Sequence, residues 1–268
     1  MTEARMQESP AHTPGSFCWV EVGTTNAAEA KNFYRELFGW DYEDGEAGPG
    51  MIYSMIKLNG KYVGGLYQLD SNMISAGVPP HWMNYISVAN ADDATAQAAA
   101  AGGSVMKGPF DVGTAGRMSI IQDPTGAVFS TWEAKDTPGA EVYGEFGAYC
   151  WQELGTNDTQ KAKDFYTTLF GWATESFPGS MEYTIFKKGN ESVGGMYQIT
   201  PEMGPIPPHW LTYFAVNDCD ATVQKATELG GSVMKPAEDI PGVGRFAILR
   251  DPASAVFAVL KPAPQQQA

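Results

Sequence analysis

The sequence is poor in cysteine, histidine and positive charge. Its 268 residues include three cysteines and three histidines, and 17 basic against 31 acidic side chains give a formal net charge of −14. Three cysteines do not build a disulfide framework, which favours a reducing compartment, the cytoplasm. The excess of negative charge argues against nucleic acid and against anionic membrane surfaces as partners, because both would repel the chain.

Long apolar runs are also missing. No run approaches the ~20 apolar residues of a membrane-spanning helix, and the polar N-terminus lacks the hydrophobic core of a secretory signal. We therefore expect no membrane partner, a disordered leader over residues 1–15 and a tail over residues 263–268. The hydrophobic fraction of 43% and the length predict a globular chain of two domains.

What the chain does have is an internal repeat. The segment FCWVEVGTTNAAEAKNFYRELFGW, which begins at Phe17, returns as YCWQELGTNDTQKAKDFYTTLFGW from Tyr149. VGGLYQ (63–68) returns as VGGMYQ (193–198), VPPHW (78–82) as IPPHW (206–210), and GGSVMK (102–107) again at 230–235. The copies keep their order, which indicates a duplicated unit. The predicted division is a first unit at 16–135, a linker at 136–145 and a second unit at 146–262.

Each unit holds two similar halves. In the first unit a strand at 18–22 leads into a helix opened by Asn26, and the turn Asn59-Gly60 joins two further strands. The second half repeats the plan with a strand at 82–88 and a helix at 90–101. Its last strands are expected at 104–112, 117–122 and 127–133.

Four of these motifs resemble those of a known protein family. The helix end KNFYRELFGW, the SVAN–ADDA junction, the GGSVMK helix exit and the QDPTGAVF hairpin resemble the vicinal oxygen chelate superfamily. That superfamily includes glyoxalase I, extradiol dioxygenases and bleomycin-resistance proteins. The resemblance covers nearly everything from Phe17 to Lys261. It implies an α+β fold of tandem units built from four βαβββ modules, whose strands curl into open cups with helices outside.

The resemblance also implies where a metal would bind, and this sequence departs from it. Metal-dependent relatives place ligands such as His, Gln or Glu on the first, fifth and eighth strands of a unit. The matching positions hold Trp19, Met83 and Ser130 in the first unit, and Trp151, Leu211 and Ala258 in the second. These side chains do not form a hard divalent site. We predict no cofactor; the alternative is iron, zinc, nickel or manganese on displaced ligands such as Glu21 and His81.

Alternation along the strands predicts which side chains line each cup. A carboxylate beside aromatic rings is partly desolvated, which raises its pKa and suits it to proton transfer, and a nearby histidine can assist. The candidate catalytic residues are Glu21, His81, Glu153 and His209. The candidate ligand-binding residues are Trp19, Tyr85, Arg117, Trp132, Trp151, Tyr213 and Arg245.

Structural roles compete with these assignments. The Pro-Pro pair before His81 and His209 holds the backbone extended, so the His-Trp pair can have the purely structural role of fixing the start of the strand. Glu21 and Glu153 can instead form ion pairs with Arg117 and Arg245, since a buried glutamate usually has a partner.

The leading hypothesis is a cytoplasmic protein, monomer or homodimer, whose aromatic-lined cup binds a small, largely apolar or aromatic organic molecule. Catalysis would be metal-independent acid–base chemistry of the isomerase, lyase or cofactor-free oxygenase type. One alternative is a resistance-type protein that sequesters its ligand unchanged. Others are a metal-dependent glyoxalase or extradiol dioxygenase with displaced ligands, and a regulatory protein with vestigial cups. The two cups need not be equally competent.

Overall fold

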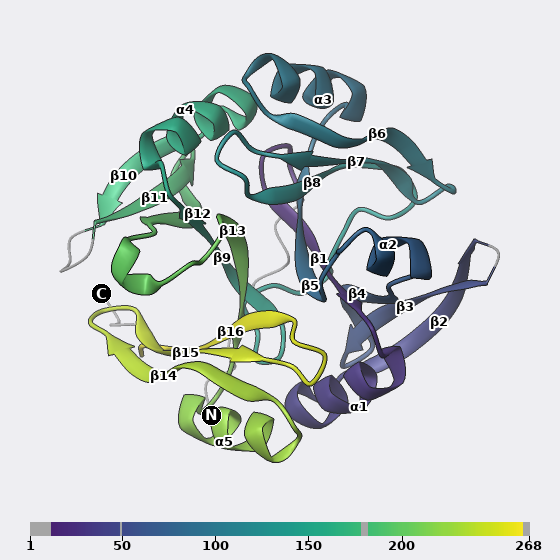
Figure 1. Ribbon diagram of the computed structural model, residues 1–268, viewed down its shortest axis with the longest axis vertical. Coiled ribbons are helices and arrows are strands. Elements are labelled where there is room, and N and C mark those ends of the chain that lie inside the picture. Colours follow the sequence, from purple (N-terminus) through teal and green to yellow (C-terminus); the bar gives the residue numbers. More distant parts are fainter. Residues whose placement is uncertain (1–11, 49, 178–181, 265–268) are drawn as a thin grey trace, which may run out of the picture.

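The computed structural model describes residues 12–48, 50–177 and 182–264, and these form two eight-stranded sheets (Figure 1). The first unit contains β1 (Phe17–Thr24), α1 (Ala27–Phe38), β2 (Asp41–Gly48), β3 (Met51–Leu58), β4 (Lys61–Gln68), α2 (Ser71–Ser75), β5 (His81–Ser87), α3 (Ala91–Ala100), β6 (Ser104–Val112), β7 (Gly116–Gln122) and β8 (Val128–Ala134). The second contains β9 (Tyr149–Thr156), α4 (Thr159–Phe170), β10 (Ala173–Phe177), β11 (Tyr183–Lys188), β12 (Glu191–Gln198), the 3-10 turn η1 (Pro201–Met203), β13 (His209–Ala215), α5 (Cys219–Glu228), β14 (Ser232–Ile240), β15 (Gly244–Arg250) and β16 (Val256–Pro262).

Both sheets have the same strand order. The first runs β2-β3-β4-β1-β5-β8-β7-β6, and the second runs β10-β11-β12-β9-β13-β16-β15-β14. The two modules of the first unit meet where β1 pairs antiparallel with β5, while β4 and β8 flank them in parallel. The predicted α+β fold of four curled modules is confirmed.

Local sequence explains where the module helices begin and end. Asn26 caps α1 by accepting a hydrogen bond from the backbone N–H of Glu29 (3.2 Å), and α1 ends at Gly39, whose φ is +75°. Asp158 and Gly171 do the same for α4, which is why this helix recurs so faithfully in both units.

Two elements differ from the sequence expectation. The strand β2 was not predicted, because its sequence DYEDGEAG is acidic and glycine-rich and has low strand propensity. Pairing with β3 makes it a strand, as pairing with β11 does for β10. The short helix α2, capped by Asp70, was also not expected.

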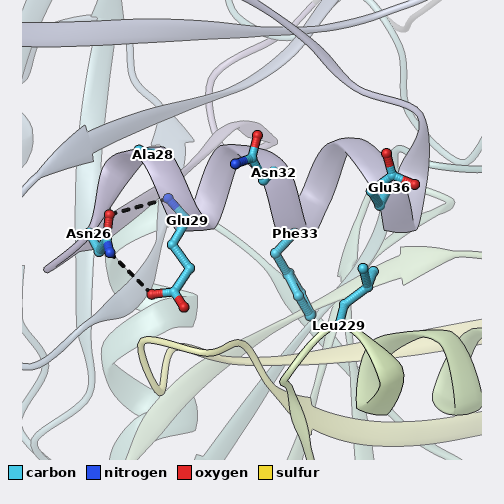
Figure 2. Close-up of a pocket in the computed structure, with 7 residues that line it drawn as sticks. All are labelled: Asn26, Ala28, Glu29, Asn32, Phe33, Glu36 and Leu229. Atoms are coloured by element: carbon cyan, nitrogen blue, oxygen red, sulfur yellow. Dashed lines mark hydrogen bonds between the residues drawn. The ribbon is translucent and has the colours of Figure 1, made fainter.

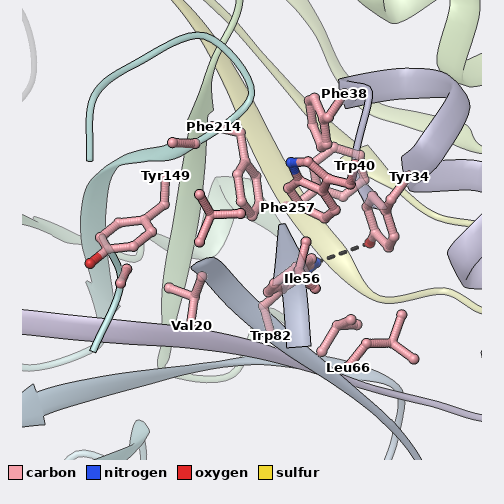
Figure 3. Close-up of a cluster of buried hydrophobic side chains, with 14 of the residues drawn as sticks. Val20, Tyr34, Phe38, Trp40, Ile56, Leu66, Trp82, Tyr149, Phe214 and Phe257 are labelled. Atoms are coloured by element: carbon pink, nitrogen blue, oxygen red, sulfur yellow. Dashed lines mark hydrogen bonds between the residues drawn. The ribbon is translucent and has the colours of Figure 1, made fainter. Parts of the chain in front are cut away.

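The units pack back to back through their aromatic side chains. The ring of Tyr34 on α1 lies 5.6 Å from Phe257 on β16, and the ring of Phe129 on β8 lies 5.6 Å from Tyr166 on α4. Figure 3 shows the first of these clusters, in which Phe214 of the second unit lies among first-unit rings. In Figure 1 α1 lies beside α5 and α3 beside α4, and these four helices lie at the perimeter.

Parts of the predicted leader and linker are firmly held. His12 Nε2 lies 2.6 Å from the carbonyl oxygen of Ala140, and the N–H of Gly15 donates to Ser87 (2.7 Å). Residues 12–15 therefore differ from the expected disorder; residues 1–11 and 265–268 lie outside the described residues. In the linker Ala140 and Val142 are buried against the core.

None of the described helices combines the length and the apolar character needed to cross a bilayer.

Candidate functional site

A hydrogen-bonded carboxylate lies at the centre of the first cup. Tyr53 donates its hydroxyl to Glu21 Oε2 (2.8 Å), and Tyr85 donates its hydroxyl to Glu21 Oε1 (2.6 Å). The indole Nε1 of Trp19 donates in turn to the Tyr53 oxygen (2.9 Å). Both oxygens of the half-buried Glu21 therefore accept a phenolic hydrogen bond.

Strand register brings these groups together. On β1, Trp19 lies opposite Tyr85 of β5, and Glu21 lies between Met83 of β5 and Gly65 of β4. Directly opposed residues of paired strands share a face of the sheet. The predicted inward orientation of Trp19, Glu21 and Tyr85 agrees with this register and with the hydrogen bonds.

Glycine makes room for the tyrosines. A Cβ on Gly65 would overlap the hydroxyl of Tyr53, so only glycine lets Tyr53 reach Glu21. A Cβ on Gly23 would lie 2.8 Å from the Tyr67 hydroxyl and 3.1 Å from His81 Cε1. Glycine at these positions is thus explained by close side-chain approach rather than by a phosphate loop.

Burial controls protonation in this cluster. It raises the pKa of Glu21, while hydrogen bonds from Tyr85 and Tyr53 partly oppose the rise. Burial and the charge of Glu21 raise the pKa of Tyr53 and Tyr85 well above the ordinary value. Both phenols therefore stay protonated at neutral pH, and the carboxyl is the group able to exchange a proton.

His81 has both a structural and a cup-facing character. Its Nδ1 lies 2.8 Å from the carbonyl oxygen of Pro79, and because a carbonyl can only accept, this contact requires a proton on Nδ1. Nε2 then carries the lone pair that can accept a proton, and burial lowers the pKa of the ring. The next residue, Trp82, points to the back of the sheet and donates to the Tyr34 hydroxyl (3.0 Å). Pro-Pro-His-Trp therefore shapes the strand entrance and also places an imidazole in the cup.

The second cup repeats the arrangement. Tyr213 donates to Glu153 Oε1 (2.8 Å), and Trp151 Nε1 donates to the Tyr183 hydroxyl (2.9 Å), which is also hydrogen-bonded to Glu153. Burial raises the pKa of Glu153, while Tyr213, Tyr183 and the charge of Lys235 lower it.

The histidine of the second cup is held like that of the first. His209 Nδ1 lies 2.9 Å from the Pro207 carbonyl oxygen, and burial lowers the pKa of the ring.

The arginines do not join the cups. Arg117 donates to both oxygens of Asp92 on α3 (2.7 and 2.9 Å), and Arg245 likewise pairs with Asp220 on α5 (2.7 and 2.8 Å). The suggested ion pairs of these arginines with Glu21 and Glu153 are therefore wrong. Arg117 alternates with the cup-facing Met118, so its side chain lies on the opposite, helix-covered face.

Trp132 does line the first cup. Its ring lies 6.2 Å from that of Tyr85, and its Nε1 donates to the carbonyl oxygen of Thr137 (2.9 Å).

Sequence reasoning missed the tyrosines that complete each cup. They are Tyr53 and Tyr67 in the first unit and Tyr183 and Tyr197 in the second. The available signal was their recurrence at equivalent positions of the repeat, with Tyr67 and Tyr197 close behind the repeated glycine pair. Their long sequence separation from Glu21 and Glu153 hid the contact.

Two surface hollows lie outside the cups, at the junction of the units. The one in Figure 2 is formed by one face of α1 and Leu229, and both polar and apolar side chains line it. The other includes Phe38, Phe146 and Lys225. Within the first cup, the Tyr53 side chain fills the space above Gly65.

The donor set of the cups does not fit a divalent metal. The positions implied by the resemblance are occupied by Trp19, Met83 and Ser130, and both oxygens of Glu21 already accept phenolic hydrogen bonds. Within residues 12–48, 50–177 and 182–264, no three His, Cys, Asp or Glu side chains are grouped so as to hold a metal ion.

Comparison with known families agrees with this architecture. The family model described as the Glyoxalase/Bleomycin resistance protein/Dioxygenase superfamily matches residues 16–131 and 150–259. The chain belongs to this superfamily. Its doubled unit and curled sheets are those of the superfamily, as the motifs at Phe17 and Tyr149 predicted.

Two similar superfamily proteins cover nearly the whole chain. A Mycobacterium tuberculosis protein named "Putative glyoxylase CFP32" is 42% identical over 264 residues, which cover 97% of this chain and 100% of that protein. The "Anthracycline biosynthesis protein DnrV" of Streptomyces peucetius is 36% identical over 262 residues, covering 92% of this chain and 94% of its own.

Solved structures share the superfamily fold at low identity. The Mn(II)-bound glyoxalase from Novosphingobium aromaticivorans has a TM-score of 0.64 at 15% identity, covering 92% of this chain and 82% of that one. The 2,3-dioxygenase LapB from Pseudomonas sp. KL28 has a TM-score of 0.62 at 12% identity, covering 96% and 97%. At such identities the likeness concerns the fold alone.

Proposed function

We propose that the protein binds a small aromatic organic molecule in its cups and that Glu21 and Glu153 exchange a proton with it without a metal. The observation that supports this most is the carboxylate of Glu21, held by Tyr53 and Tyr85 among apolar and aromatic walls. A raised carboxyl pKa brings the group closer to neutral pH, where a general base is most useful. The repetition of the cluster around Glu153 adds support.

The aromatic class of ligand rests on the lining and on one relative. Trp19, Met83, Tyr85 and Trp132 are apolar or aromatic side chains, which suit a flat ring system. The DnrV protein is named for anthracycline biosynthesis, and anthracyclines are fused, hydroxylated ring systems. We therefore propose a hydroxylated polycyclic aromatic compound as the substrate class.

The chemistry best suited to the cup is a proton shift of the isomerase or lyase type. Glu21 takes a proton from an acidic C–H or O–H of the ligand and returns it to another atom, so no electrons are gained or lost. Once Glu21 carries the proton, the O–H groups of Tyr53 and Tyr85, which until then donate to Glu21, turn to an enolate or phenolate oxygen of the ligand and stabilise it. Nε2 of His81 is a second proton acceptor on the same face. The free thiols Cys18, Cys150 and Cys219 support the reducing cytoplasm as the place of action.

The test uses Glu21→Gln, Glu153→Gln and the double variant with 1,8-dihydroxyanthrone, whose C10–H is acidic. Exchange of this hydrogen with D₂O is followed by anaerobic NMR, and affinity by quenching of tryptophan fluorescence. General-base catalysis contributes about 10²- to 10⁴-fold, so the double variant should lose at least ~100-fold in exchange rate with little change in affinity. Glu46→Gln, an exposed carboxyl on β2, is the control. Exchange that survives in the double variant would refute the role of the glutamates.

Sequestration without catalysis is the second candidate. The same hydrogen bonds favour it, because both oxygens of Glu21 already accept a hydrogen bond and are less available to take a proton from the ligand. The metal positions of the superfamily, which hold Trp19, Met83 and Ser130, supply no metal ligands for catalysis either. Tight binding of the anthrone by the wild type with no accelerated exchange would support this function and reject the first.

A further inference from the structure

A lysine occupies the outer strand of each cup. Lys107 lies on β6 and Lys235 on β14, each at the end of the repeated GGSVMK. From the edge strand inward, Lys107 of β6 lies opposite Ile120 of β7, and Ile120 lies opposite Ser130 of β8. Ser130 in turn lies opposite Tyr85 of β5. Directly opposed residues share a face, which puts Lys107 on the face of Tyr85. The register of β6 shifts on both sides of Lys107, but its Nζ lies over the ring of Phe110, which is opposite Met118, and Met118 Sδ lies 4.0 Å from the Tyr85 hydroxyl.

The register of the second sheet repeats this placement. Lys235 lies opposite Ile248, Ile248 opposite Ala258, and Ala258 opposite Tyr213. Each cup therefore has the tyrosine–glutamate pair in its middle and an ammonium group on its outermost strand.

The two lysines differ in their partners. Lys107 Nζ lies 4.2 Å from the ring centroid of Phe110. Lys235 Nζ lies 4.9 Å from the ring centroid of Phe246 and 2.6 Å from Glu238 Oε1. Across the described parts of the chain, no carboxylate forms an ion pair with Lys107.

One amino-acid difference between the repeated units explains why Lys235 has a carboxylate partner and Lys107 does not. Phe110 stands where the repeat places Glu238, three residues beyond the lysine in each copy. Both cups thus have an ammonium group over an aromatic ring, but only in the second does a carboxylate neutralise it. A cation over a ring keeps N–H donors available for an anion.

We propose that the first cup selects an aromatic carboxylate, bound at its acidic end by Lys107, and that the second cup prefers a neutral aromatic molecule. This rests on the proposed binding of aromatic molecules in the cups. Lys107 and Phe110 bind the acidic end of the ligand, and the rings Trp19 and Tyr85 bind its aromatic body. In the second cup Glu238 already pairs with Lys235, and its negative charge repels a ligand carboxylate.

Matched probes separate charge from shape. Anthraquinone-2-carboxylate and anthraquinone-2-carboxamide have the same ring system and differ in charge. Titration calorimetry on the full chain should show one site that binds the carboxylate at least tenfold more tightly than the other site does. Lys107→Met should weaken carboxylate binding at least tenfold and amide binding less than twofold, whereas Lys107→Arg should retain most of the affinity. Lys61→Met, an exposed lysine outside the cups, is the control.

The exchanged position provides the reciprocal test. Phe110→Glu should reduce carboxylate affinity in the first cup, and Glu238→Gln should raise it in the second. Added salt should weaken carboxylate binding in the wild type but not in Lys107→Met. Circular dichroism of each variant checks that the fold is retained.

The outcomes distinguish the two proposals. If neither probe binds the wild type, the proposed aromatic ligand class fails. If both probes bind equally and Lys107→Met changes nothing, aromatic binding stands and the selection of a carboxylate is overturned.

Discussion

Glycine 65 sets the geometry of the first cup because it has no side chain. The Tyr53 hydroxyl occupies the space in which any Cβ at position 65 would lie, and from there it donates to Glu21 and accepts from Trp19. Gly195 and Tyr183 repeat this contact in the second unit. One missing methyl group in each unit thus determines whether the carboxylate keeps its second phenolic donor.

Gly65→Ala should therefore displace Tyr53 and break the hydrogen bonds that join it to Glu21 and Trp19. Overpacking a filled site costs about 1–3 kcal/mol, so the free energy of unfolding should fall by about that amount in chemical denaturation. Gly108→Ala is the control, because a Cβ there meets no atom within 4 Å. Equal stability of the two variants would contradict the predicted clash.

The raised carboxyl pKa values predict a particular dependence of stability on pH. Folded Glu21 and Glu153 retain protons at pH values where the unfolded chain has already released them, because burial raises both pKa values. Their stabilising contribution is fully present below the unfolded pKa of about 4.3 and is lost as pH rises through the folded pKa.

Glu21→Gln with Glu153→Gln should remove that loss. The unfolding free energy of the double variant relative to wild type should rise as the pH increases above about 4.3, by about 1.4 kcal/mol for each unit of raised pKa. Denaturant titrations at several pH values measure the difference, in which contributions of other groups cancel. A stability difference between variant and wild type that stays constant or falls as the pH rises would show that folding does not raise the pKa of these carboxyl groups.

At the scale of elements, the strand after Pro-Pro-His-Trp links the two units. Trp82 on β5 donates to the Tyr34 hydroxyl (3.0 Å), and Tyr34 donates to Asp251 Oδ2 in the β15–β16 turn of the other unit (3.0 Å). The mirrored chain runs from Trp210 through Tyr166 to Asp123 (2.8 and 2.9 Å). The repeated motif therefore serves the contact between units as well as the cup.

Tyr34→Phe should break this link while keeping the ring. A buried donor or acceptor left without its partner costs about 1–3 kcal/mol, so loss of the hydroxyl should destabilise the chain by that order, measured by thermal and chemical unfolding. Tyr62→Phe is the matched control, since its hydroxyl makes exposed contacts with Glu43 (3.4 Å) and Lys57 and its loss should change little. A loss from Tyr34→Phe no larger than that from Tyr62→Phe would argue that the link is energetically neutral.

At the scale of the whole molecule, each unit supplies the other's core. Phe129 is fully buried against Phe165, Tyr166 and Phe170 of α4, and Phe214 is packed between Trp40 and Trp82. The back face of each sheet is thus covered partly by a helix of its own unit and partly by the other unit. The two units should therefore unfold together.

Calorimetry of the full chain should show one transition, with equal calorimetric and van't Hoff enthalpies. Phe129→Ala should lower the stability of the whole transition by about 3–5 kcal/mol rather than split it. Two transitions, with only one shifted by Phe129→Ala, would mean that the units are thermodynamically independent.

The amino-acid sequence by itself determined the doubled plan, the superfamily and the faces of the central strands. Repeats, helix caps and the alternation that places Trp19, Glu21 and Tyr85 on one face are local properties, visible in short stretches. That is why these features could be predicted without any knowledge of how the strands associate.

The tertiary structure alone decided which side chains contact each other in the cups. Tyr53 and Glu21 are 32 positions apart, and their contact depends on how β3, β4 and β1 align and on the glycine between them. Arg117 was a candidate partner of Glu21 and a candidate ligand-binding residue, but alternation on β7 directs it to Asp92 of α3. Strand register and the packing of one unit on the other are set by all the side chains of both sheets together, so no short segment could specify them.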